Sequence, residues 1–276
     1  MPVKPFQTAE RKAILRNLPV FPTVALELIK MLEEEGGADL HVVARLLGRD
    51  PALSAEVLRQ SNSALFARRG GVSDLVSAVT LLGSQHTCRI AMNAACRGLA
   101  APALGRAELR QCWEHCVSTA FLAAALSPEF DQAAGTAYTA GLLHDVGCLA
   151  LLSVYPDRYL ETVRMSAEES IPRLEVERRL FGVDHCTVGS WLVEEWQLPP
   201  ELRDVIILHH DQRPFERSLV SLVAAANVLA HLTQPHPIER VAWESPSSYL
   251  ATLPIDQNRS LRLVDEAVEL IKIEVA

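Results

Sequence analysis

Residues 141–152 read GLLHDVGCLALL, an apolar stretch that contains one adjacent histidine and aspartate, His144 and Asp145. Burying an ionised carboxylate is costly unless a partner or a metal compensates its charge. The pair therefore has two interpretations. It binds a metal ion, or it is the remnant of a metal site and now has a structural role. In the second case Asp145 holds neighbouring imidazoles through charge-assisted hydrogen bonds.

The composition around this stretch predicts an all-α protein. Apolar residues make up 49% of the 276 residues and aromatic residues only 5%, and most of the apolar content is leucine and alanine. Both are strong helix formers. The length fits one large domain or two small ones, with enough chain to bury a core.

The charge argues against a nucleic-acid partner. The formal net charge is −8 and the pI is about 5.6, whereas non-specific binding to nucleic acid needs a field of lysine and arginine. Arg68 and Arg69 form a small basic patch beside a glycine pair. A solvated loop is the simpler interpretation of that patch.

The sequence shows none of the patterns typical of export or membrane insertion, so we expect a cytoplasmic protein. The start, MPVKPFQTAERK, lacks the apolar region of a signal peptide. No uninterrupted apolar run reaches the roughly 18 residues of a membrane span. The six cysteines show no CxxC spacing. We therefore expect reduced thiols in a cytoplasmic protein with no membrane segment.

Helical periodicity dominates the first hundred residues. Residues 40–47 follow the i, i+3, i+4, i+7 pattern of one helix. Asp50 and Pro51 then predict the start of the next helix, and Ser73 predicts another N-cap. Asn62 lies between two serines, a setting in which asparagine fixes the local backbone through its side chain.

A stretch with Pro102 and Gly105 suggests a boundary between two parts of the chain. We expect an N-terminal helical part over 1–105, a helical core over 106–232 and a C-terminal part over 233–276. The last begins with a loop rich in proline and serine and ends in a helix that covers the core. Helices in the core are expected over 112–126, 137–154, 185–196, 200–210 and 218–232, with a charged helix around 174–180.

Four histidines fall on the apolar faces of separate predicted helices: His115, His144, His185 and His209. Asp145 and His210 are adjacent to two of them. A single inward histidine is commonly a core residue bonded to a carbonyl. Four of them with a carboxylate match the ligands that Zn, Fe, Mn or Ni use in sites between facing helices. A metal there would activate water for attack on phosphorus. Spacing alone does not show that the four meet, so both interpretations stay open.

Six blocks, in order, resemble the HDOD family, the HD-related output domains of bacterial signalling, within the HD superfamily of metal-dependent phosphohydrolases. The blocks are LPVFPTVALELIKML (18–32), LLGRDPALSAEVLRQSNSALF (46–66), GVSDLVSAVTLLG (71–83), GLLHDVG (141–147), DHCTVGSWLVEEWQLPPEL (184–202) and ILHHD (207–211). The similarity covers residues 12–232. It implies an all-helical fold and a regulatory role in which a generally non-catalytic domain docks other signalling proteins. It also implies that any divalent metal is bound among His115, His144, Asp145, His185, His209 and His210. The chain has no room for a receiver domain, so we expect a stand-alone version.

Two departures from the superfamily weaken a catalytic interpretation. Asn227, in AAANVLAH, stands where active HD enzymes carry a late aspartate, and an amide brings no charge to a metal. Cys148 stands where the branch that cleaves cyclic di-GMP has a lysine, and no GYP motif follows His209 and His210. Metal binding stays open, because the other candidate ligands are present.

Three hypotheses follow, and we assign no catalytic residue. The first is a non-enzymatic regulatory domain that binds signalling proteins. The second is a metal-dependent phosphohydrolase or phosphodiesterase that acts on a nucleotide or another phosphoester. The third is a sensor that binds a nucleotide without chemistry. No glycine-rich phosphate loop favours a particular nucleotide.

Overall fold

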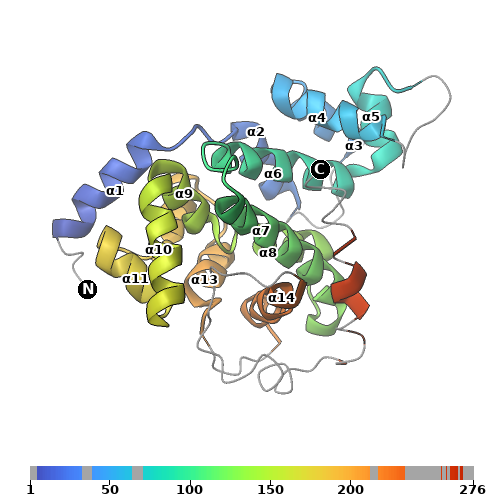
Figure 1. The fold of residues 1–276 in the computed structure, drawn as a ribbon. Coiled ribbons are helices and arrows are strands. Elements are labelled where there is room, and N and C mark those ends of the chain that lie inside the picture. The colour runs from blue at the N-terminus through green and yellow to red at the C-terminus, as the bar shows by residue number, and fades with distance from the viewer. Residues whose placement is uncertain are drawn as a thin grey trace. The chain divides into compact units, whose positions relative to one another are not determined.

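The computed structural model describes residues 5–32, 39–63, 71–211 and 217–233, with residues 256, 259, 262–266, 268 and 269 (Figure 1). Every regular element in these residues is a helix, which confirms the all-α prediction. Contacts divide the chain into two compact units. One is Val20–Gly98, and the other combines Met1–Pro19 with Leu99–Ala276. The predicted parts, 1–105, 106–232 and 233–276, stay predictions.

Three short helices of the unit Val20–Gly98 begin at aspartate caps, which are Asp39, Asp50 and Asp74. In it α3 and α4 pack against α5, and α2 packs against α3. Asp50 caps α4, as predicted. The predicted cap at Ser73 is wrong, because Asp74 caps α5 and its carboxylate accepts from the Ser77 N–H at 2.8 Å. A charged cap also interacts more favourably with the helix dipole than a hydroxyl does. The helices are α2 (Thr23–Leu32), α3 (Leu40–Leu47), α4 (Pro51–Ser61), α5 (Leu75–Leu82) and α6 (Ser84–Ala100), whose last two residues belong to the other unit.

Asn62 fixes the backbone at the end of α4, as predicted. Its Nδ2 donates to the carbonyls of Leu58 and Val72 at 2.9 and 2.7 Å. Its Oδ1 accepts from the Val72 N–H at 2.7 Å. One side chain thus ties the last turn of α4 to the segment that leads into α5.

The second unit holds the candidate site. Its central helix is α7, against which α8 and α14 pack, while α12 packs on α9 and α13 (Figure 1). Val264, near the C-terminus, joins the core between α7 and α14, which supports the expectation that this segment covers the core. The helices are α1 (Pro5–Asn17), α7 (Ala107–Leu126), η1 (Ser127–Phe130), α8 (Ala134–Leu143), α9 (Val146–Val154), α10 (Pro156–Glu169), α11 (Arg173–Phe181), α12 (His185–Glu195), α13 (Pro200–Leu208) and α14 (Leu219–Thr233).

The single helix predicted over 137–154 is wrong, because it divides into α8 and α9 at a turn formed by His144 and Asp145. The two halves pack on different helices. A Cβ on Gly141 would lie 2.8 Å from Ala120 Cα in α7, and one on Gly147 would overlap the His185 carbonyl oxygen in α12. The apolar pattern runs through both halves, so periodicity alone does not reveal the turn. The turn is explained by the two glycines, because Gly141 lets α8 approach the backbone of α7 and Gly147 lets α9 approach the backbone of α12.

The stretch Ala134–Val154 is long and apolar enough to cross a membrane by length and composition. Its most apolar window has a mean hydropathy of 1.4, and 94% of that window lies buried inside the protein. Core helices pass the same test, so this is a weak indication of a span. The sequence analysis predicted no membrane segment because it considered only uninterrupted apolar runs, and this stretch is interrupted by polar residues. Arg68, Arg69 and the predicted loop over 234–258, apart from residue 256, lie outside the described residues.

Candidate metal centre

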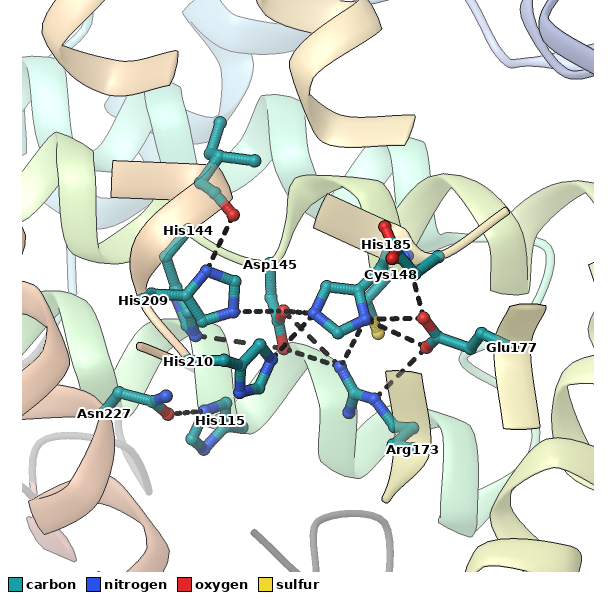
Figure 2. A network of polar contacts seen from close by, with 12 residues as sticks. His115, His144, Asp145, Cys148, Arg173, Glu177, His185, His209, His210 and Asn227 are labelled. Carbon is teal, nitrogen blue, oxygen red and sulfur yellow. Dashed lines mark hydrogen bonds and ion pairs between the residues drawn. The ribbon is translucent and has the colours of Figure 1, made fainter. Parts of the chain in front are cut away.

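The structure brings the six predicted site residues together in two neighbouring groups of possible metal ligands (Figure 2). One group is His115, His144 and Asp145, and the other is His185, His209 and His210 with Cys186. Asp145 joins the two groups, because it lies 3.2 Å from His185 and 3.4 Å from His209. His115 lies in the middle of α7. The others lie at helix ends: His144 and Asp145 between α8 and α9, His185 as the first residue of α12, and His209 and His210 directly after α13. The four predicted inward histidines are buried, and His210 is partly buried.

His144 and His209 are oriented in the same way, by carbonyls of the helix that each of them follows. The Nδ1 of His144 lies 2.7 Å from the Gly141 carbonyl, and the Nδ1 of His209 lies 2.9 Å from the Ile206 carbonyl. A carbonyl only accepts, so each Nδ1 carries a proton that it donates to that carbonyl. Both Nε2 atoms face the Asp145 carboxylate, at 3.8 Å from His144 and 3.4 Å from His209.

His185 lies between two carboxylates. Its Nδ1 is 2.7 Å from Glu177 Oε2, and its Nε2 is 3.2 Å from Asp145 Oδ1 and 2.9 Å from His210 Nε2. The Glu177 carboxylate also accepts from the backbone N–H of His185 at 2.8 Å. Burial alone would lower the pKa of His185, but Glu177, with Cys186 and Asp145, holds the pKa well above its usual range. The ring therefore donates from both nitrogens, and it must release a proton before it can bind a metal.

Arg173 supplies a cation at the centre of the cluster. Its Nη2 lies 3.2 and 3.5 Å from the two oxygens of Asp145, and its Nε lies 3.2 Å from Glu177 Oε1. The residue is only 5% exposed. Burial would raise the pKa of Asp145, but Arg173, His185 and His144 outweigh that effect and hold the pKa well below its usual range. Asp145 is thus a carboxylate whose charge the protein itself compensates.

Arg173 and Glu177 belong to the cluster, and the sequence pattern does not single them out. They lie in RLEVERRLF, whose many charges predict only a charged helix. A signal was present, because Arg173 and Glu177 are four residues apart and share a helical face with the apolar Val176. All three are buried. Two opposite charges on the apolar face of a polar helix indicate a buried ion pair.

Asn227 belongs to the site, beside His115. Its Oδ1 lies 2.8 Å from His115 Nε2, so the imidazole N–H donates to the amide oxygen. The Asn227 Nδ2 is buried, and the described residues offer it no hydrogen-bond partner. His231, one turn further along α14, stacks on His115 with ring centroids 4.6 Å apart, and sequence reasoning did not single it out. The pairing with Asn227 directs the Nε2 proton of His115 to an amide and leaves that nitrogen unavailable to a metal.

Cys148 lies beside the cluster but has a different partner. Its Sγ lies 2.9 Å from the Tyr159 hydroxyl, which in turn donates to Glu177 Oε1 at 3.3 Å. Burial raises the pKa of the Cys148 thiol well above its usual range. A protonated thiol is a poor metal ligand. All six cysteines are free and buried.

The donor set fits one divalent metal. His144, His185 and His209 each have Nδ1 engaged by an acceptor and Nε2 directed at one carboxylate, which is how metal-ligating histidines are usually held. Three imidazoles and one carboxylate suit Zn, Fe, Mn or Ni. Arg173 opposes such an ion, because it already bonds both oxygens of the carboxylate.

Comparison with known proteins agrees with this geometry. Residues 18–212 match the model of the HDOD domain family. The chain belongs to the HDOD domain family. A solved HDOD domain protein of unknown function from Geobacter sulfurreducens is 24% identical, with a TM-score of 0.76 and coverage of 98% of both chains. At that identity the similarity shows the shared fold.

Two longer proteins are similar to this chain over part of their length. A solved putative signal transduction protein from Marinobacter aquaeolei is 23% identical, with a TM-score of 0.74, and the match covers 98% of this chain and 64% of that one. A protein of Treponema pallidum (strain Nichols), described as uncharacterized, is 27% identical over 265 residues, which are 92% of this chain. The chain spans about half the length (49%) of that curated relative.

Proposed function

We propose that this HDOD domain is a non-catalytic regulatory domain of bacterial signal transduction that acts by contacting other proteins. The observation that carries the proposal is the position of Arg173. Its guanidinium bonds both oxygens of Asp145, the carboxylate toward which the Nε2 atoms of three histidines are directed. A hydrolytic centre needs that carboxylate for its metal. The description of the Marinobacter relative as a putative signal transduction protein supports the signalling part of the proposal.

A second candidate is a metal-dependent phosphohydrolase or phosphodiesterase, favoured by the convergence of the Nε2 atoms of His144, His185 and His209 on Asp145. A bound divalent ion would supply an activated water and polarise a phosphoryl oxygen. Asn227 counts against this candidate, because its amide adds no charge where the resemblance expects a second carboxylate. Protein partners and a nucleotide ligand stay predictions.

A turnover assay separates the two candidates. We expect no hydrolysis of bis(p-nitrophenyl) phosphate, p-nitrophenyl phosphate or a panel of mono-, di- and cyclic nucleotides with added Zn, Fe, Mn or Ni. His144→Ala is the matched control, since it removes one of the directed Nε2 atoms. Wild-type hydrolysis that falls by orders of magnitude in this variant would end the non-catalytic proposal.

A further inference from the structure

We infer that Arg173 and a divalent metal ion are alternative occupants of the site around Asp145, so that Arg173 sets the metal affinity of the site. The inference deepens the proposed function and rests on it, because in that function Arg173, and not a metal ion, compensates the negative charge of Asp145. Figure 2 shows the guanidinium entering between Asp145 and Glu177, on the side of the cluster next to His185.

The two occupants exclude each other for electrostatic reasons. Arg173 Nη2 lies within 3.5 Å of both Asp145 oxygens and 3.4 Å from His185 Nδ1. A metal bound to Asp145 would place two positive charges beside a guanidinium that never loses its own. Like charges a few ångströms apart repel strongly where water is excluded. Asp145 is 1% exposed, so solvent does not screen them.

Arg173 lies at the start of α11. Arg173 is the first residue of the helix and follows Pro172, so its side chain projects from a helix end. Glu177, one turn later, is held by the backbone N–H and the Nδ1 of His185, at 2.8 and 2.7 Å. The Glu177 carboxylate is therefore held by α12, and metal binding requires only that the Arg173 side chain change its position.

Replacing Arg173 with glutamine tests the inference by zinc binding, measured by calorimetry without substrate. We expect Arg173→Gln to bind about one equivalent of zinc at least about tenfold more tightly than the wild type, a coupling of typical size between two linked occupants. The gain disappears when His144→Ala is added. Arg179→Gln is the matched control, because Arg179 lies on the same helix, half exposed and paired with Glu175. It should bind zinc as the wild type does.

A second variant covers the case in which the glutamine variant does not fold. Arg173→Lys keeps one positive charge, but a single ammonium cannot reach Asp145 and Glu177 through separate nitrogens as arginine does. Its zinc affinity should fall between those of the wild type and the glutamine variant. Zinc affinity unchanged from the wild type in every folded variant overturns the inference. Turnover by the wild type would instead refute the proposed function, so the two failures are distinguishable.

Discussion

Gly147→Ala is expected to lower the free energy of unfolding by at least about 3 kcal/mol, or to prevent folding, because a methyl group there has no space. A Cβ would overlap the His185 carbonyl oxygen and lie 2.6 Å from the Gly189 nitrogen. Both are backbone atoms of α12, so no side-chain rotation relieves the clash. Since His185 begins α12, any shift of that helix also moves its imidazole. Urea unfolding followed by circular dichroism measures the loss.

Gly98→Ala is the matched control for that substitution. Gly98 lies in α6, and a Cβ there would meet nothing within 4 Å. Alanine should therefore stabilise the helix by about 0.5–1 kcal/mol. Similar small effects of both substitutions would show that α9 and α12 are not in such close contact.

Glu177→Ala should lower the free energy of unfolding by roughly 3–5 kcal/mol, the usual cost of removing one partner of a buried ion pair. The fully buried carboxylate accepts from His185, through its backbone and its ring, and from Tyr159, and it pairs with Arg173. The substitution would leave all of these buried donors without their shared carboxylate. Chemical unfolding of the full chain gives the free-energy difference.

Glu175→Ala on the same helix shows whether the effect belongs to the buried network. Glu175 is 52% exposed and pairs with Arg179 on the surface. Exposed pairs contribute about 0–1 kcal/mol, so this substitution should change stability little. If Glu177→Ala were equally mild, the network around His185 would not be a stabilising element.

The sequence predicted the helical class well because composition and periodicity are local properties. Residues 40–47 and the cap at Asp50 are found where the pattern placed them. The division of 137–154 was missed because the apolar pattern does not change at His144 and Asp145. Its causes are the contacts of Gly141 with α7 and of Gly147 with α12, which are visible only in three dimensions.

The cluster was predictable as a group of inward histidines with one aspartate, but not as a charge network. His115, His144, His185 and His209 could be selected from the sequence because each lies at an apolar position. The partners that decide their chemistry could not be selected in the same way. Arg173 is hidden among the surface charges of α11. Asn227 was noted as an amide in place of a carboxylate, but its bond to His115 depends on the packing of α14 against α7.

The metal content of the wild-type protein, purified without chelator or a metal-affinity tag, tests the central claim most directly. If Arg173 compensates the charge of Asp145, mass spectrometry of the metals should find far less than about one equivalent of iron, manganese, nickel or zinc. About one equivalent of any of them, lost in His144→Ala, would contradict the claim and show that a metal occupies the site despite Arg173.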